Sequence, residues 1–189
     1  MLLKLYICLK TFIRHKVFKI DDRSQLDIAI ANGLKLGENC HIMGGCIIDP
    51  GHCWLIEIGD NVTLAPRVHI LAHDASTKRE LGYTRIGGVK IGNNVFIGAG
   101  SIILPGVFIG NNVIIGAGSI VCKDIPDNSI AIGSPSKVID SYENFMKRRK
   151  KEMELLPCYD SSYKIGNITP EKKKQMIKEI KLNKFGYIQ

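Results

Sequence analysis

The sequence has six cysteines in 189 residues but no Cys-x-x-C pair, so we expect neither a zinc module nor a redox disulfide of that type. It also lacks a cleavable secretory signal and any apolar run long enough to span a bilayer. Reduced, buried thiols and a cytoplasmic location are therefore predicted. With 45% apolar and 23% charged residues, the chain is neither disordered nor fibrous.

Positive charge is scarce in the middle of the chain, although the net charge is +8. Residues 24–139 carry eight basic and nine acidic side chains, whereas residues 1–23 carry six and two and residues 140–189 carry twelve and seven. A nearly neutral centre argues against nucleic-acid binding, which needs Lys and Arg clustered on one face. The basic ends leave contact with an anionic membrane or polymer open, and Leu2 to Leu9 is either a segment packed on the body or an in-plane membrane anchor.

Isoleucine (29 residues) and glycine (19 residues) are abundant, and most of them lie between residues 36 and 139. Residues 91–102 and 109–120 match at every position but one, where Phe96 corresponds to Ile114. The offset between the copies is eighteen residues, and inside each copy an aliphatic side chain recurs every six. A period of six describes neither an amphipathic helix nor a simple alternating strand.

A short strand followed by a tight corner fits this period. Asn and Gly recur at the corner positions, and both residue types accept positive φ at little cost. Three such faces make one triangular coil of eighteen residues. Equivalent side chains of successive coils then stack about 4.8 Å apart, which is the spacing of hydrogen-bonded strands. We predict a prism of stacked coils with isoleucine filling its interior.

This repeat resembles that of the hexapeptide-repeat acyltransferases over residues 34–140. Three runs are most similar to the sugar and polysaccharide O-acetyltransferases: Ile91–Gly98, Val121–Ser129 and Gly133–Lys137. The resemblance implies an all-β fold, a left-handed parallel β-helix of hexapeptide repeats. It also implies a homotrimer whose active sites lie between neighbouring β-helices.

The chain is predicted to have three parts: a basic and apolar N-terminal extension (1–33), the β-helix domain (34–140) and a basic, largely helical C-terminal extension (141–189). Residues 72–88 lack the six-residue beat and are expected to leave the β-helix as an extruded loop. Helix-favouring residues run from Ser136 to Leu156, and Thr169 is expected to cap a helix that begins at Pro170.

His73 stands where the repeat breaks, at the base of the extruded loop. In the resembled O-acetyltransferases a histidine at this point is the general base, and the resemblance extends that role to His73. A sugar hydroxyl has a pKa far above neutrality, so a neutral imidazole must take its proton as the oxygen attacks the thioester. Direct transfer in a ternary complex is expected, so neither Cys46 nor Cys122 is needed as an acyl carrier.

The resemblance implies acetyl-CoA as the co-substrate, bound along a seam between coils. Its candidate contacts are small residues of two repeat faces with nearby polar or basic residues: Gly98, Ala99, Gly116, Ala117, Cys122, Lys123 and Lys137. The backbone N–H of Ala99 is a candidate oxyanion donor, and the two lysines are candidate phosphate contacts. The alternative is that these small residues are simply what a tight corner tolerates. Phe96 stands where the family commonly has tryptophan.

Candidate acceptor-binding residues are acidic or lie on the loop: Asp49, Asp74, Arg79, Glu80, Tyr83 and Arg85. Asp49 resembles an acidic residue that binds sugar hydroxyls in related enzymes, and the alternative for it is a turn-capping role. Asp74 is interpreted as a loop or acceptor contact, since adjacent residues on a strand point to opposite faces. For the other loop residues the alternative is ordinary solvated charge.

No metal site is predicted. His69 and His73 are close in sequence, but zinc catalysis needs a third ligand. His41 and His52 are expected to lie two coils earlier, about 10 Å away by strand spacing.

The sequence therefore predicts a CoA-dependent O-acetyltransferase that acts on a hydroxyl of a sugar or polysaccharide intermediate. In the implied trimer, His73 of one chain faces the Ala99, Ala117 and Lys123 ridge of the next. Two alternatives stay open. One is an N-acetyltransferase for an amino sugar or its nucleotide derivative, whose amine is already nucleophilic. The other is a non-enzymatic solenoid used for assembly.

Overall fold

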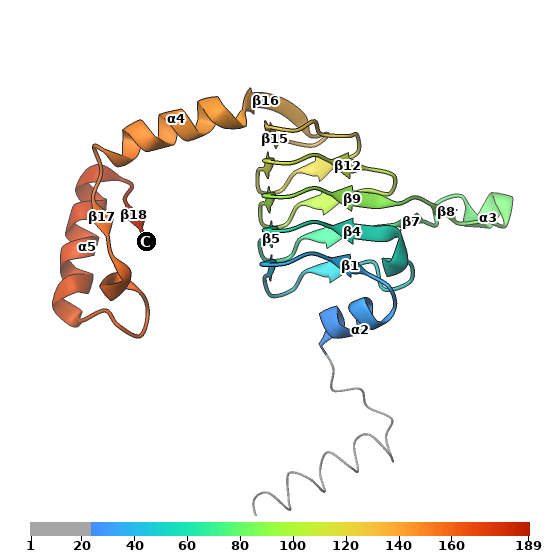
Figure 1. The fold of residues 1–189 in the computed structure, drawn as a ribbon, viewed down its shortest axis with the longest axis horizontal. Coiled ribbons are helices and arrows are strands. Elements are labelled where there is room, and N and C mark those ends of the chain that lie inside the picture. The colour runs from blue at the N-terminus through green and yellow to red at the C-terminus, as the bar shows by residue number, and fades with distance from the viewer. Residues whose placement is uncertain (1–23) are drawn as a thin grey trace, which may run out of the picture.

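The computed structural model describes residues 24–189, so both interpretations of Leu2 to Leu9 lie outside the described residues. From β1 to β15 the chain winds through stacked coils whose strands form three sheets with parallel neighbours (Figure 1). The first sheet contains, in spatial order, β1 (Lys35–Leu36), β4 (Ile56–Ile58), β9 (Val89–Ile91) and β12 (Phe108–Ile109). The third contains β3 (Ile47–Ile48), β6 (His69–Ile70), β11 (Ile102–Ile103) and β14 (Ile120–Val121).

The second sheet is the longest and carries the end of the β-helix. Its parallel part contains β2 (His41–Ile42), β5 (Thr63–Leu64), β10 (Phe96–Ile97), β13 (Ile114–Ile115) and β15 (Ser129–Ile132). The last strand, β16 (Lys137–Ser141), pairs with β15 in the antiparallel sense. The predicted parallel β-helix of hexapeptide repeats is therefore confirmed.

Equivalent residues of successive coils stack in register in the interior. Ile97 lies between Leu64 of one neighbouring coil and Ile115 of the other, and none of the three is exposed. Burying such a side chain contributes roughly 1.5–3 kcal/mol relative to leaving it exposed. The aliphatic side chains that recur every six residues thus form one continuous core along the prism.

Asparagine holds the corners, as the sequence predicts. Asn61, Asn94 and Asn112 have φ values of 55°, 56° and 53°, the left-handed region that asparagine tolerates better than most residues. Their side chains also form a ladder along the edge, because the amide of Asn61 donates to Asn94 at 3.1 Å and that of Asn94 donates to Asn112 at 3.1 Å. The corner residues therefore connect the coils as well as turning the chain.

Two insertions leave the prism along the same edge. One follows β3 and the other follows β6, and these two strands are neighbours in the third sheet. After β3 comes a turn that contains the short helix η2 (Cys53–Leu55). After β6 comes the predicted extruded loop, which is a hairpin of β7 (His73–Asp74) and β8 (Arg85–Ile86) with α3 (Lys78–Leu81) at its tip. The same edge of the fold thus carries both irregular segments.

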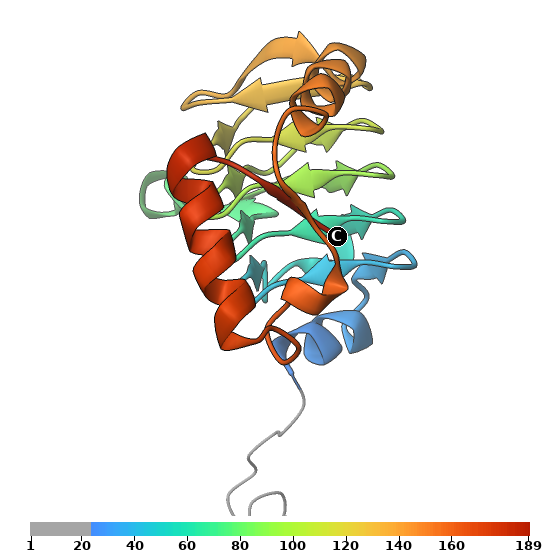
Figure 2. The ribbon, with the colours of Figure 1, turned by 90° about the vertical axis from the view of Figure 1, so that its left-hand side faces the viewer.

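Helical segments flank the prism. The helix α2 (Gln25–Ala31) begins with a capping box formed by Ser24 and Asp27, and its Ala29 packs against the first coil. At the other end α4 (Tyr142–Met153) leads away from the coils (Figure 1). The rest of the C-terminal segment follows α4, stands apart from the coils in Figure 1 and lies in front of them in Figure 2. It contains β17 (Cys158–Tyr159), η3 (Ser161–Tyr163), α5 (Pro170–Asn183) and β18 (Tyr187–Ile188).

The two predicted C-terminal helices are present, but one starts later than expected. Thr169 caps α5 by accepting a hydrogen bond from the backbone N–H of Lys172, as predicted. The first helix begins at Tyr142 instead of near Ser136, because residues 137–141 pair with β15 as β16. Within residues 24–189, every helix is too short or too polar to cross a bilayer.

Replacing Gly98 with alanine is expected to destabilise the coil stack. A Cβ atom on Gly98 would lie 2.4 Å from the backbone nitrogen of Ala117 in the next coil, and that backbone cannot move without breaking the ladder. Forced overpacking of this kind costs about 3 kcal/mol. Thermal unfolding should show a clearly lower Tm, whereas Gly44→Ala, where no atom lies within 4 Å, is the matched control. Equal Tm values for the two variants would contradict this reading of the packing.

Candidate functional site

The shared edge brings together residues that are far apart in the sequence. The strands β3 and β6 are direct neighbours, with Ile48 opposite Ile70, and the backbone N–H of Asp49 donates to the Ile70 carbonyl at 2.9 Å. His73 comes three residues after Ile70. It therefore lies beside Asp49, although 24 residues separate the two along the chain.

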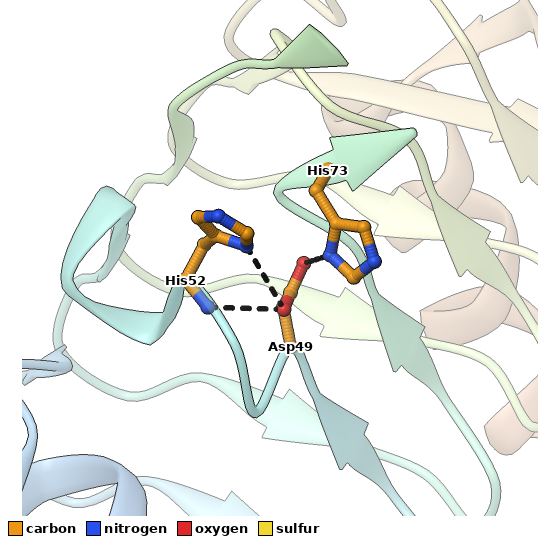
Figure 3. Close-up of side chains that lie close together, drawn as sticks. All are labelled: Asp49, His52 and His73. Atoms are coloured by element: carbon orange, nitrogen blue, oxygen red, sulfur yellow. Dashed lines mark hydrogen bonds and ion pairs between the residues drawn. The ribbon is translucent and has the colours of Figure 1, made fainter. Parts of the chain in front are cut away.

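The carboxylate of Asp49 is completely buried, and Figure 3 shows it next to His52 and His73. Its Oδ1 accepts from the backbone N–H groups of Gly51 at 3.0 Å and His52 at 3.1 Å. Its Oδ2 accepts from the backbone N–H of Ala72 at 2.8 Å and lies 2.5 Å from Nδ1 of His73. Four N–H groups of this chain thus occupy both carboxylate oxygens, and no oxygen is free for an acceptor sugar.

Opposing effects set the pKa of the Asp49 carboxyl. Burial raises it, but the hydrogen bonds from Ala72, His73 and Gly51 together outweigh burial and hold the pKa below its ordinary value of 3.8. Asp49 is therefore an anion at neutral pH. Because the anionic carboxylate can only accept a hydrogen bond, the proton of neutral His73 is assigned to Nδ1. The other ring nitrogen, Nε2, then carries the lone pair.

A cavity of about 560 Å³ opens beside this histidine. Its lining comes from the hairpin and from the corners that follow the third-sheet strands: Leu71, His73, Asp74, Ala75, Arg85, Leu104, Pro105 and Cys122. The predicted residues His73, Asp74 and Cys122 therefore share one cavity. Two other predicted loop residues, Arg79 and Tyr83, lie outside this lining and are largely exposed.

The hairpin register explains which loop residues reach the cavity. Asp74 pairs with Arg85 across β7 and β8, so Arg85 returns to the base of the loop. The carboxylate of Asp74 accepts a hydrogen bond from the backbone N–H of Ser76, and this bond with the nearby Arg85 charge lowers the Asp74 pKa. The side chain is exposed and available to a ligand, as its interpretation as a loop or acceptor contact requires.

The predicted donor-binding residues fall on two edges of the prism. Gly98, Ala99, Gly116 and Ala117 lie in stacked coils at the corner between the second and third sheets, where the N–H of Gly118 donates to the Ala99 carbonyl at 2.9 Å. Cys122 and Lys123 follow β14, at the corner between the third and first sheets, and Lys137 begins β16. The expected single ridge of Ala99, Ala117 and Lys123 is therefore wrong within one chain, because Lys123 lies along the edge of His73.

His52 is the neighbour that the sequence analysis missed. Its ring centroid lies 5.1 Å from that of His73, whereas two coils and about 10 Å were expected. The expectation was wrong because β3 and β6 belong to adjacent coils and the turn capped by Asp49 folds His52 back over the edge. The Asp-Pro-Gly turn signal was the only hint in the sequence, and it supported the turn-capping alternative for Asp49.

Asp49, His52 and His73 also form a group whose possible ligand atoms all lie within 4.8 Å of one another. Two imidazoles and a carboxylate are an ordinary zinc donor set. Both oxygens of Asp49 are already bonded to N–H groups, however, so an ion would have to displace the His73 hydrogen bond. The residues as arranged do not fit a metal, and metal independence stays a prediction.

Comparison with known proteins identifies relatives of this chain. The family described as bacterial transferase hexapeptide (six repeats) matches residues 88–123. Protein CapG of Staphylococcus aureus is 38% identical over 159 residues, which cover 82% of this chain and 88% of CapG. A maltose O-acetyltransferase from Clostridium difficile 630 has a solved structure with a TM-score of 0.52 and 48% identity, covering 56% of this chain and 57% of that one.

A second solved structure is a hexapeptide-repeat acetyltransferase from Vibrio cholerae in complex with acetyl coenzyme A. It has a TM-score of 0.53 and 26% identity, covering 58% of this chain and 61% of that one. The chain thus spans most of CapG but less than two thirds of each solved enzyme. These similarities confirm the resemblance drawn from the repeat: the chain belongs to the hexapeptide-repeat acetyltransferases, CoA-dependent enzymes of the type that includes the maltose O-acetyltransferase.

Proposed function

We propose that this protein transfers the acetyl group of acetyl-CoA to a hydroxyl of a sugar or polysaccharide intermediate, with His73 as the general base. The observation that carries the proposal is the 2.5 Å contact between Nδ1 of His73 and the buried Asp49 carboxylate. It holds the ring in the tautomer that a base needs. The relatives support the chemistry, since one is named a maltose O-acetyltransferase and another binds acetyl coenzyme A.

In the proposed reaction, Nε2 of His73 removes the proton of the acceptor hydroxyl as its oxygen attacks the thioester carbonyl. The new C–O ester bond forms, the C–S bond breaks, and the imidazolium returns its proton to the departing CoA thiolate. Asp49 stabilises the transient positive charge on the ring through the bond at Nδ1. No acyl-enzyme is formed, so the exposed thiol of Cys122 serves as part of the cavity wall and carries no acyl group.

The proposed acceptor contacts are revised by this geometry. Asp49 is reassigned from acceptor binding to the orientation of His73, because its carboxylate is buried and fully bonded. Asp74 and Arg85 line the cavity and are proposed to hydrogen-bond the acceptor. Arg79 and Tyr83 are proposed to contact only the distal part of a long acceptor, since they lie at and beside the exposed tip of the hairpin.

A homotrimer remains the proposed assembly. Within one chain, the small-residue corner at Gly98, Ala99, Gly116 and Ala117 lies along a different edge from the cavity of His73. A neighbouring subunit that presents its small-residue corner to this cavity would bring a backbone N–H such as that of Ala99 toward the thioester carbonyl. Lys123 and Lys137 are proposed to meet the phosphates of CoA.

The proposed function is tested by thiol release from acetyl-CoA with a panel of neutral sugars, nucleotide sugars, oligosaccharides and amino sugars. We expect release with hydroxyl acceptors, a product heavier by one acetyl group, and loss of that group on treatment with hydroxylamine, which cleaves esters. A product formed only from amino sugars and stable to hydroxylamine would establish N-acetyl transfer instead. The absence of release with every acceptor of the panel would overturn the proposed acceptor class.

A further inference from the structure

His52 is the third side chain of the cluster and has no role in the proposed reaction. Its backbone N–H binds Asp49 Oδ1 at 3.1 Å, and its ring nitrogen Nδ1 lies 3.8 Å from the same oxygen. The ring is tilted by 45° against His73 at a centroid distance of 5.1 Å and by 49° against Trp54 at 5.4 Å (Figure 3 draws Asp49 and both histidines). The imidazole of His52 thus lies close to two other rings, beside the carboxylate.

The Nδ1 atom of His52 is shielded from solvent and has no hydrogen-bond partner among residues 24–189. A distance of 3.8 Å to Asp49 is too long for a hydrogen bond, but it keeps the Nδ1 atom within electrostatic range of the carboxylate charge. A lone pair at this nitrogen would face the negative charge of the carboxylate at close range. The tautomer with the proton on Nδ1 directs a positive N–H dipole at Oδ1 and is therefore the favoured one.

We infer that His52 is a positioning residue of this site, which holds the Asp49 carboxylate in place through its Nδ1–H dipole so that Oδ2 stays aimed at His73. The inference rests on the proposed function, because it acts through His73 as the base. While His73 carries the proton of the acceptor, its charge is balanced by Asp49 alone among its hydrogen-bond partners. A carboxylate that turns on its axis loses this alignment, and the Nδ1–H dipole of His52 beside Oδ1 opposes that rotation.

Two variants of His52 separate its polarity from its shape. His52→Phe keeps an aromatic ring near His73 and Trp54 but removes the N–H, whereas the amide of His52→Asn keeps a donor near the position of Nδ1. Both variants retain the backbone N–H that binds Asp49. We expect His52→Phe to lower kcat about tenfold with the KM for acetyl-CoA unchanged, and His52→Asn to retain kcat within about threefold of the natural protein. Thermal unfolding of both variants verifies that they fold.

Wild-type kcat in folded His52→Phe would overturn the inference, and so would equal losses in the two variants, since the donor would then make no difference. Loss of activity with EDTA that zinc restores would overturn it as well, because the cluster would then be a metal site. The failure of the proposed function looks different. If His73→Ala is fully active, the base role falls and the inference falls with it; if His73→Ala is inactive while His52→Phe matches the natural protein, only the inference falls.

Discussion

We expect replacement of His73 with alanine to lower kcat by a factor on the order of 10² or more and to leave the Kd for acetyl-CoA unchanged. The reason is that a hydroxyl is a poor nucleophile until a base takes its proton, and Nε2 of His73 is the nitrogen left free by the bond between Nδ1 and Asp49. Each factor of ten corresponds to about 1.4 kcal/mol of transition-state stabilisation, so the expected loss is about 3 kcal/mol or more.

A second substitution at the same position separates the base from its hydrogen bond. His73→Asn keeps an N–H donor for Asp49 but has no nitrogen at the place of Nε2, so its kcat should fall as far as that of His73→Ala. His69→Ala is the matched control, since His69 lies in the neighbouring strand β6 and does not line the cavity. Steady-state thiol release gives kcat, and isothermal titration gives the Kd for acetyl-CoA. Activity near the natural level in either His73 variant would contradict the general-base role.

The prism itself could be predicted from sequence because its cause is local and periodic. Between residues 91 and 121 every coil has the same length, so stacking of Ile97 on Ile115 follows from an offset of eighteen residues. The corners were equally predictable, since asparagine tolerates the positive φ that they need. His73 could also be predicted from the sequence, because it stands where the periodic pattern stops.

The partners of His73 could not be predicted because they depend on coils of unequal length. Leu64 stacks on Ile97 across thirty-three residues and Ile48 on Ile70 across twenty-two, so an eighteen-residue offset misplaces everything before residue 91. The turn after β3 and the hairpin after β6 leave the prism at the same edge. The contact between them is formed only in the folded protein, and no periodic pattern in the sequence indicates it. The sequence therefore predicts only that Asp49 contacts the acceptor or caps the turn, and it wrongly predicts that His52 lies two coils away.

The positions of the loop residues within the hairpin could not be predicted from the sequence either. The loop sequence offers several polar residues, and nothing in their order distinguishes those at the base from those at the tip. The antiparallel pairing of Asp74 with Arg85 decides the matter, because it returns Arg85 to the cavity and leaves Arg79 on the exposed helix α3. Strand pairing over two residues is too short to be read from alternation.

Replacing Asp49 with asparagine is the second large effect expected, a loss of kcat on the order of 10²-fold with little change in the KM for the acceptor. The carboxylate accepts four N–H groups, two at each oxygen, and an amide offers only one oxygen. If the NH₂ group takes the place of Oδ2, His73 must turn its lone pair toward it, which moves the ring proton to Nε2 and removes the base. If it takes the place of Oδ1, the N–H groups of Gly51 and His52 face a donor and the turn is strained.

The same substitution changes the stability of the fold with pH in a defined direction. The pKa of Asp49 is lower in the folded protein than its ordinary value of 3.8, so the carboxylate stabilises the fold above that pH and loses this contribution as the pH falls below it. The Tm difference between Asp49→Asn and the natural protein should therefore shrink as the pH falls below 3.8. If Asp49 instead binds the acceptor, the kinetics of Asp49→Asn should show the opposite pattern, with a raised KM for the acceptor and an unchanged kcat. That outcome would return Asp49 to the acceptor site, whereas a lowered kcat at unchanged KM supports its role in orienting His73.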